Sequence, residues 1–363
     1  MRTFDFETRI PRVIFGAGSL RHLAREIDRL GAKRALVLST PDQVEGANRV
    51  AHMLGSRAAG LFTKAAMHVP IESAREAREQ ARRLGADCAV AIGGGSTTGL
   101  GKAIALESSV DKPLAILAIP TTYAGSEMTS IYGITDAGVK KTGRDPRVLP
   151  RTVIYDPELT LTLPWSLTIT SSLNAIAHAA EGLYAHDGNP IIGLMAEEGI
   201  RAAAAAMPRL ASDPLDAEAR ADALYGAWLC GVVLGHVSMG LHHKLCHTLG
   251  GTFNLPHAQV HAVILPHALA YNAQRAPEAM RRVARALAAG GPPGREGSAP
   301  ALMFDLALKH GAPMALKDVG MPQDGLDRAA ELAVKDQYPN PRALEKAGIR
   351  ELLQRAFDGV RPG

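Results

Sequence analysis

Cysteine is scarce in this sequence, and long apolar runs are absent from it. Cys88, Cys230 and Cys246 form an odd set without CxxC spacing, which argues against a disulfide framework and fits a reducing compartment. The opening stretch MRTFDFETRI lacks the apolar segment of a signal peptide, and the longest apolar runs, such as AWLCGVVLG, are too short to span a bilayer. We therefore expect a cytoplasmic protein with no membrane partner.

Aromatic residues are also few, at 4% of the 363 residues, and the basic residues form no run. The formal net charge of +4 is mild for this length, so nucleic acid is not an expected partner and an anionic small molecule is weakly favoured. With 47% apolar residues and many Ala and Gly, the composition excludes disorder and favours a helical or α/β enzyme. The length fits two domains.

Short apolar strands alternate with amphipathic helices in the first part of the chain. RVIFG, RALVLST, CAVAIGGG and LAILAIPTT have the apolar, β-branched character of buried strands. Between them, residues 19–30 and 71–85 keep apolar side chains at helical spacing. Because strand and helix alternate, the pattern predicts a parallel sheet with helices packed on it.

The pattern of residues in the sequence changes near residue 160. From Pro164 onward the segments are long, Ala- and Leu-rich and without convincing strands. We predict an α/β domain at residues 1–158 and an all-α domain at residues 159–363. The stretch GGPPGREGS, residues 290–298, is predicted to be a surface loop.

A glycine-rich turn follows the third predicted strand. AIGGGSTTGLGK places three glycines at the end of that strand, with Ser96 as a candidate N-cap of the next helix. Amides at a helix N-terminus can bind a pyrophosphate, and bare glycines let it come close. The segment fails both the G-x-G-x-x-G and the P-loop signatures, and a tight turn alone is the alternative interpretation. Three consecutive glycines exceed what a turn needs, so we expect a dinucleotide to contact Gly93, Gly94, Gly95, Ser96 and Thr97.

Hydroxyl-bearing residues follow two other predicted strands. IPTTYAGSEMTS supplies Thr121, Thr122 and Ser126 at the carboxyl edge of the sheet, where cofactor clefts form, although such turns are common. ALVLST ends at Ser39 without the acidic residue that usually selects NAD over NADP. Nearby Asp42 leaves that selection open. We therefore expect either NADH or NADPH as the cofactor.

Histidine is concentrated in residues 240–267. His243 and His247 are predicted to share one face of a helix that ends at Gly250-Gly251, and His257 to return to the same pocket. Because each buried imidazole needs a hydrogen-bond partner, packing alone explains the concentration poorly. Six of the thirteen histidines lie in this segment, namely His242, His243, His247, His257, His261 and His267.

A metal is the first chemistry that such a segment suggests, since neutral imidazoles bind zinc and iron well. Asn174 and His178 lie four residues apart in another predicted helix and could complete the ligand set. The amide oxygen of Asn174 is a poorer ligand for Fe²⁺ or Zn²⁺ than a carboxylate, and it compensates less of the charge of the ion.

These motifs resemble the iron-containing alcohol dehydrogenase family in their order and over nearly the whole chain. The resemblance implies an N-terminal dinucleotide-binding domain, a C-terminal helical domain and a site in the cleft between them. It also implies that Gly99 stands where the family usually has Asp. The metal ligands of the family, an Asp and three His, correspond to Asn174, His178, His243 and His257.

Both departures, together with LNAIAHAAEGLYA and HHKLCHTLGGTFNLPHA, resemble one branch of the family, the maleylacetate reductases. This resemblance implies a metal-independent reduction, by NADH or NADPH, of the conjugated C=C bond of maleylacetate to 3-oxoadipate in aromatic catabolism. Hydride addition to such a conjugated ketone produces an enolate that hydrogen-bond donors can stabilise, and a His can supply the proton. Since the substrate is a dicarboxylate dianion, a neutral Asn174 suits its pocket.

We therefore expect no metal at the degenerate ligand set, and a homodimer as the assembly. His243 is the leading candidate for the proton donor, while Asn174 and Lys244 are expected to line the substrate pocket. Three alternatives remain open: a metal-dependent alcohol dehydrogenase, a metal-dependent lyase like dehydroquinate synthase, and a nucleotide-binding sensor without activity. The cationic catalytic pocket is expected to consist of His178, His243, His247 and His257.

Overall fold

The computed structural model describes residues 3–108, 113–137, 139–289 and 297–363. Its contacts divide the chain into two compact units. The first is an α/β unit, Arg9–Thr162, and the second is a helical unit that combines Leu163–Gly363 with the segment that ends at Thr8. Most of the loop predicted at residues 290–298 lies outside the described residues.

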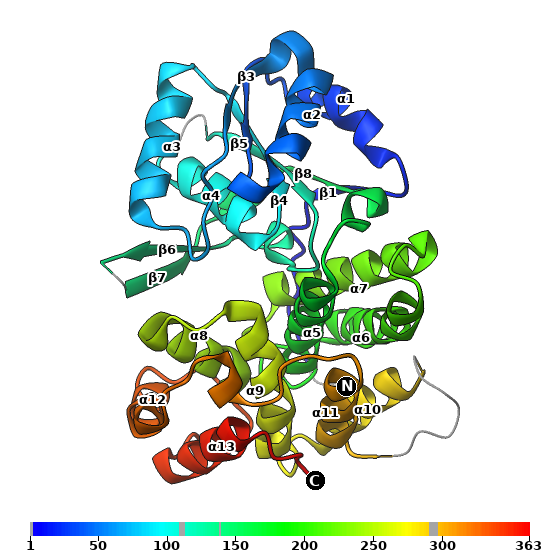
Figure 1. Ribbon diagram of the computed structural model, residues 1–363, viewed down its shortest axis with the longest axis vertical. Helices are drawn as coiled ribbons and strands as arrows, with labels where there is room; N and C mark the ends of the chain where they lie inside the picture. The colour runs from blue at the N-terminus through cyan, green and yellow to red at the C-terminus, as the bar shows by residue number, and fades with distance from the viewer. Residues whose placement is uncertain (1–2, 109–112, 138, 290–296) are drawn as a thin grey trace. The chain divides into compact units, whose positions relative to one another are not determined.

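The expected α/β domain with a parallel sheet is confirmed (Figure 1). Six parallel strands lie in the order β1-β8-β5-β4-β2-β3. Strands β2, β4 and β8 are buried along their whole length, as expected when helices cover both faces of a parallel sheet. The bounds are Arg12–Phe15 for β1, Ala35–Leu38 for β2, Ala58–Phe62 for β3, Cys88–Gly93 for β4, Ala115–Pro120 for β5 and Thr152–Tyr155 for β8.

Helices cover both faces of this sheet (Figure 1). Val37 of β2 packs with the helices of one face, α1 and α2, whereas its neighbours Leu36 and Leu38 pack with α3 and α4 on the other. This alternation follows from the period of two along a strand. The bounds are Leu23–Arg29 for α1, Val44–Leu54 for α2, Ile71–Arg83 for α3 and Gly95–Leu106 for α4.

The α/β unit also contains a two-stranded antiparallel hairpin that the sequence did not predict. Its strands are β6, Ile131–Asp136, and β7, Val139–Arg144. The amide of Thr135 donates to the carbonyl of Val69, which ties the hairpin to the segment before α3. Short 3-10 helices also occur in both units, at Ser19–His22, Pro41–Gln43, Gly55–Arg57, Ser126–Met128, Pro146–Val148, Pro157–Thr160, Leu316–Val319 and Gln323–Gly325.

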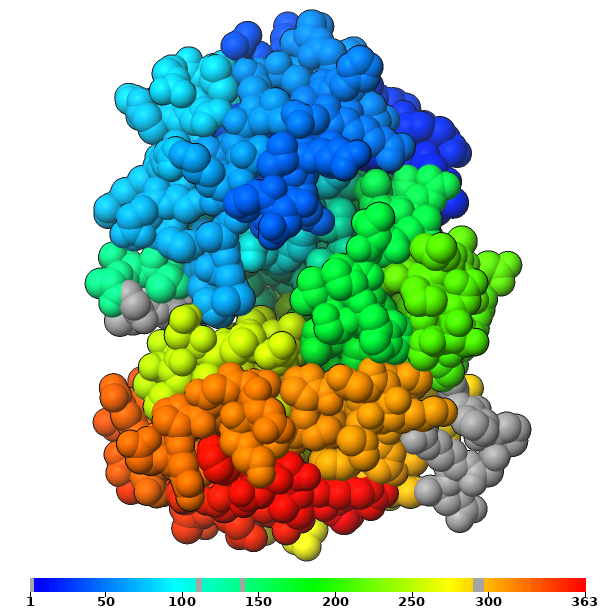
Figure 2. Space-filling view, viewed as in Figure 1, coloured from blue at the N-terminus to red at the C-terminus, as the bar shows by residue number. Residues whose placement is uncertain are grey.

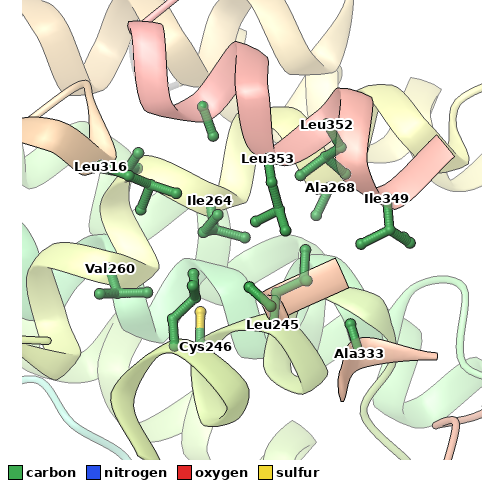
Figure 3. Close-up of a cluster of buried hydrophobic side chains, with 14 of the residues drawn as sticks. Leu245, Cys246, Val260, Ile264, Ala268, Leu316, Ala333, Ile349, Leu352 and Leu353 are labelled. Carbon is green, nitrogen blue, oxygen red and sulfur yellow. The ribbon is translucent and has the colours of Figure 1, made fainter. Parts of the chain in front are cut away.

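The helical unit has a core built from helices distant in sequence. Figure 3 shows Leu352 and Leu353 of α13 facing Ile264 and Ala268 of α9, with Cys246 of α8 in the same cluster. In the space-filling view, the C-terminal segments, orange to red, form a continuous face of this unit (Figure 2). The bounds are Trp165–Gly182 for α5, Pro190–Ser212 for α6, Ala217–His236 for α7, Leu241–Phe253 for α8, His257–Asn272 for α9, Pro277–Ala289 for α10, Ala299–Lys309 for α11, Leu326–Ala333 for α12 and Lys346–Asp358 for α13.

Helix α8 does not end where the sequence predicted. It continues through Gly250 and Gly251 to Phe253, so the prediction that this glycine pair ends the helix is wrong. Glycine is tolerated inside a helix that packing holds in place. The stop comes instead from Asn254, which has a left-handed conformation with φ of 53°, two residues before Pro256.

No single helix in the described ranges is long and apolar enough to cross a membrane. Helices α7 and α8 meet such a test together on length and composition alone, although they are bent by 94° at their junction.

Candidate active site

Three helices of the helical unit bring the predicted histidines together. His178 lies on α5, His243 and His247 on α8, and His257 at the start of α9. The rings of His178 and His243 stack with centroids 5.0 Å apart, and those of His247 and His257 stack at 6.5 Å. His243 and His247 lie 6.0 Å apart and connect the two stacks. The structure therefore gathers the four predicted histidines into one cluster.

Asn174 lies one helical turn before His178 and is also buried, with 7% of its surface exposed. Its Oδ1 atom, Nδ1 of His178 and Nε2 of His243 are buried and have no hydrogen-bond partner among the described residues. Buried polar atoms are rarely left unpaired in folded proteins. These atoms therefore mark a place that is prepared for a polar ligand.

Glu181, which the sequence did not single out, organises this cluster. It lies on α5 and is fully buried. Its Oε2 atom accepts a hydrogen bond of 2.6 Å from Nδ1 of His243 and one of 2.9 Å from the amide of Gly240. Its Oε1 atom accepts from the amide of His242 at 2.9 Å and from the hydroxyl of Tyr184 at 3.0 Å. The carboxylate thus caps the N-terminus of α8, where the helix dipole favours a negative charge.

These contacts keep Glu181 ionised despite its burial. Burial raises the pKa of Glu181, but the hydrogen bond and charge of His243 and the two backbone amides outweigh that effect, so the pKa is lowered. An ionised carboxylate can only accept, so Nδ1 of His243 carries the proton of this hydrogen bond. Nε2 of His243 is then the atom left for a ligand.

Burial also changes the expected charge of the cluster. The pKa of His178 is held well below its ordinary value by burial and by the charges of the neighbouring histidines. His178 is therefore neutral near pH 7, and the expectation of a cationic pocket is wrong for this residue. A neutral imidazole still offers one donor and one acceptor to a ligand.

His247 and Lys244 are linked through Tyr338, another residue that the sequence did not indicate. Nδ1 of His247 lies 3.0 Å from the hydroxyl oxygen of Tyr338. Nζ of Lys244 lies 5.7 Å from the centroid of the same ring, a cation–π distance. Tyr338 thus contacts both Lys244 and His247, which places the ammonium group of Lys244 near the cluster.

A second group of contacting side chains on α8 and α9 consists of His242, Cys246 and His261. Nε2 of His242 is 2.9 Å from Nδ1 of His261, and Sγ of Cys246 is 3.6 Å from the same Nε2 atom. The ring of His261 is 4.4 Å from that of His257 and 5.1 Å from that of His243, so it belongs to the cluster. Among the described residues, His267 makes no ring contact with the cluster, and its charged neighbour is Arg355.

The residues at the family's metal positions form a poorer set of metal ligands than the family's own Asp and three His. The set contains an amide in place of the carboxylate, and the rings of His178 and His243 are stacked with only 28° between their planes. An amide oxygen is a weaker ligand for Fe²⁺ or Zn²⁺ than a carboxylate oxygen. Within the described ranges, the one group of three His, Cys, Asp or Glu side chains with ligand atoms all within 4.8 Å is His242, Cys246 and His261.

That second group does not have the spacing of a zinc site. Two nitrogens bound to one tetrahedral zinc ion stand about 3.3 Å apart. The separation of 2.9 Å between Nε2 of His242 and Nδ1 of His261 is that of a hydrogen bond. We therefore interpret this pair as hydrogen-bonded.

The glycine turn of the α/β unit joins β4 to α4. Gly93 has φ of 148°, and a Cβ atom there would lie 2.4 Å from Oγ1 of Thr97. A Cβ atom on Gly94 would lie 2.9 Å from Oγ1 of Thr122, whereas one on Gly95 would be 3.7 Å from its nearest neighbour, an ordinary contact. The turn itself requires the first two glycines. The bare backbone at Gly95, the first residue of α4, is the position that fits the close approach of a phosphate.

Ser96 lies inside the first turn of α4 and is not its N-cap, so that prediction is wrong. The N-cap position is Gly94, whose extended backbone lets the chain enter the helix. Gly94, Gly95 and Ser96 are partly exposed, whereas Thr97 is fully buried beneath the turn. The helix N-terminus therefore presents backbone to a ligand and not a capping side chain.

The other predicted cofactor residues occupy different depths of the α/β unit. Ser39 is fully buried, and its hydroxyl donates to the carbonyl of Thr40. Thr121 is buried and accepts a hydrogen bond of 2.7 Å from Nε2 of Gln43. Ser126 and Thr122 are partly exposed, and Thr122 adjoins Gly94. Of the predicted cofactor-binding residues, the partly exposed ones are therefore Gly94, Gly95 and Ser96 of the glycine turn together with Thr122 and Ser126.

Comparison with known proteins gives matches over the whole chain. Residues 11–157 match the family model described as iron-containing alcohol dehydrogenase, and residues 168–357 match the Fe-containing alcohol dehydrogenase family, C-terminal. The maleylacetate reductase of Burkholderia cepacia is 69% identical over 362 residues, which cover 100% of both chains. That of Sphingobium indicum is 57% identical over 97% of this chain and 96% of its own. The crystal structure of maleylacetate reductase from Agrobacterium tumefaciens matches with a TM-score of 0.92 at 54% identity and covers 100% of both chains.

Proposed function

The chain belongs to the iron-containing alcohol dehydrogenase family, and we propose that it reduces maleylacetate to 3-oxoadipate with NADH or NADPH and without a metal ion. It is an oxidoreductase, as its close relatives are. The relatives named maleylacetate reductase support the substrate, which is a small dicarboxylate of aromatic catabolism.

The observation that carries the metal-independent chemistry is the arrangement around Glu181 and His243. A fully buried carboxylate holds Nδ1 of His243 at 2.6 Å and leaves its Nε2 atom for a ligand. This is the way in which a carboxylate orients a histidine for proton transfer. Asn174 and His178 add unpartnered polar atoms of neutral side chains beside it.

The reaction needs one hydride and one proton. The glycine turn and the N-terminus of α4 would hold the phosphates of NADH or NADPH, and the bound cofactor would supply a hydride to the alkene carbon farther from the ketone, so that the electron pair of the double bond moves into an enolate. Hydrogen-bond donors of the histidine cluster stabilise the enolate oxygen. His243 then gives a proton from Nε2 to the alkene carbon beside the ketone, and Glu181 stabilises its imidazolium form before that transfer.

The conjugated ketone makes a Lewis acid unnecessary for this step. An alcohol dehydrogenase must stabilise an alkoxide, for which a metal ion is effective. Here the negative charge is spread over an enolate, and neutral donors in a buried site can hold it. A neutral Asn174 also avoids placing a carboxylate against the carboxylates of the substrate.

Oxidation of NADH and of NADPH should be followed with maleylacetate, before and after dialysis against a strong chelator. We expect maleylacetate-dependent oxidation of at least one cofactor, at a rate that the chelator does not change. Loss of the rate with chelator and its recovery with Fe²⁺ or Zn²⁺ would favour a metal-dependent alcohol dehydrogenase. No net oxidation of either cofactor would rule out the reductase.

A further inference from the structure

We propose that His261 is a second hydrogen-bond donor to the bound dicarboxylate, with its proton fixed on Nε2 by His242. This inference rests on the proposed function and adds a residue that corresponds to none of the family's metal positions. His261 would touch the substrate or its enolate, whereas His242 would be a positioning residue that acts through His261.

The position of His261 is the first argument. Its ring lies 5.1 Å from that of His243, 4.4 Å from that of His257 and 6.4 Å from that of His178. A ligand bound among these rings would therefore meet His261.

The hydrogen bond to His242 is the second argument. Nε2 of His242 and Nδ1 of His261 are 2.9 Å apart, so one of these atoms must carry a proton and the other must be bare. Both rings are fully buried, and burial favours their neutral forms, each with a single N–H group. The donor in this hydrogen bond therefore decides the tautomer of both residues.

Two arrangements are possible, and they differ in where a buried N–H group is left without an acceptor. If His261 donates, the proton of His242 lies on its Nδ1 atom, which is buried and has no partner among the described residues. If His242 donates, the proton of His261 lies on its Nε2 atom, which is also buried and without a described partner. The second arrangement places the unpaired donor on His261, whose ring lies 5.1 Å from that of His243 and 4.4 Å from that of His257, so the oxygens of a dicarboxylate bound among these rings can accept it.

Cys246 supports the second arrangement. Its Sγ atom is 3.6 Å from Nε2 of His242 and lies in the hydrophobic core of the helical unit with Leu245 and Val260 (Figure 3). An N–H group on Nε2 of His242 can be shared between Nδ1 of His261 and this weak sulfur acceptor. In the other arrangement, Nε2 of His242 has one lone pair, which Nδ1 of His261 already occupies.

The tautomer can be measured directly in the wild-type protein. In uniformly ¹⁵N-labelled full-length protein, long-range ¹H–¹⁵N correlation spectra separate bare from protonated imidazole nitrogens, and His261→Gln identifies the signals of His261 by their loss. We expect a proton on Nε2 of His261 and a bare Nδ1. A proton on Nδ1 with a bare Nε2 would overturn the proposal, whatever reaction the enzyme catalyses.

Kinetics then test the contact with the substrate. His261→Leu removes the donor, and we expect kcat/KM for maleylacetate to fall about 10- to 100-fold, as for a lost hydrogen bond to a charged group. The KM for the nicotinamide cofactor should stay unchanged. His261→Gln keeps an N–H group near the position of Nε2 and should recover most of the loss.

His267→Leu is the matched control, because it also removes a buried histidine of α9 but lies outside the cluster. Its kcat/KM should stay within about twofold of the wild type, since surface and core changes away from a site act mainly on stability. The proposed contact between His261 and the substrate would be overturned if kcat/KM fell equally in His261→Leu and His267→Leu, or if it did not fall in His261→Leu. Absence of maleylacetate reduction by the wild type would instead remove the proposed function, while the tautomer measurement stands on its own.

Discussion

At the scale of single residues, Asn174 is the position where this chain departs most clearly from a metal enzyme. Its amide occupies the place of the family's carboxylate ligand and keeps a buried, unpartnered Oδ1 atom beside His178. The difference between an amide and a carboxylate is one negative charge at nearly constant shape. That single charge bears both on the affinity for a cation and on the repulsion of a dianion.

Asn174→Asp should therefore raise the affinity for Zn²⁺ or Fe²⁺ and lower the turnover of maleylacetate. We expect a tenfold or greater fall in kcat/KM, since about 1.4 kcal/mol of repulsion corresponds to a factor of ten. Metal content after dialysis against Zn²⁺ and kinetics with and without chelator measure the two effects. A wild-type protein that already holds one equivalent of metal at this site would contradict the metal-free interpretation.

Glu181 is the residue whose charge should matter most to His243. Glu181→Gln keeps the shape of the side chain but removes the charge that holds Nδ1 of His243 at 2.6 Å. We expect kcat/KM to fall by roughly 100-fold or more, the usual contribution of a positioned acid or base. Glu197→Gln is the control, because Glu197 pairs with Arg282 and Arg285. If both variants kept wild-type kinetics, the assignment of His243 as proton donor would be wrong.

At the scale of elements, the site is built from side chains four residues apart on three helices. The spacing of His243 and His247 and of Asn174 and His178 is visible in the sequence, because a helix repeats every 3.6 residues. The partners that orient these histidines are not visible in this way. Glu181 is 62 residues from His243 and Tyr338 is 91 residues from His247, so only the packing of α5, α8 and the segment after α12 brings them together.

The same contrast holds for the glycine turn, where the sequence shows three glycines but not which of them the turn needs. A Cβ atom would clash with Thr122 at Gly94 and meet only an ordinary contact at Gly95. Gly94→Ala should therefore lower the melting temperature. Gly95→Ala should leave it unchanged or raise it slightly, because Ala is favoured over Gly within a helix.

Cofactor binding should be weakened by Gly95→Ala, the variant that leaves the melting temperature unchanged or slightly higher. Gly95→Ala should raise the KM for NADH or NADPH several-fold, because a methyl group then lies where the phosphates approach the N-terminus of α4. Fluorescence titration with the cofactor and thermal melts of both variants measure the two effects. Unchanged cofactor affinity in Gly95→Ala would show that the dinucleotide does not use this backbone.

At the scale of the whole molecule, the sequence predicted the parallel sheet and the helical unit because each depends on periodicity. Strand β3, AAGLF, was missed because it has no β-branched residue and acquires its structure from pairing with β2. The end of α8 was misplaced because the core that holds Gly250 and Gly251 in the helix is formed by tertiary contacts. Local signals thus specified the elements, whereas their ends and their polar partners depended on contacts distant in sequence.

Whole-molecule stability should depend on pH through His267. Burial, and to a lesser extent Arg355, lowers the pKa of His267 to about 4. The unfolded chain protonates His267 below about pH 6.5, whereas the folded chain does so only near pH 4. The contribution of His267 to the free energy of unfolding is therefore complete above about pH 6.5 and is lost as the pH falls from about 6.5 to about 4. The loss amounts to about 3 kcal/mol over this range, at about 1.4 kcal/mol for each pH unit.

His267→Gln removes this contribution, so its unfolding free energy should fall less steeply with acid than that of the wild type. Both tryptophans, Trp165 and Trp228, lie in the helical unit, and their fluorescence in urea reports its unfolding. The buried histidines of the cluster add a dependence of the same sign to both proteins, which cancels in the difference between them. The two stability curves should therefore converge from pH 7 toward pH 4.5, and parallel curves would show that His267 does not take up its proton on unfolding.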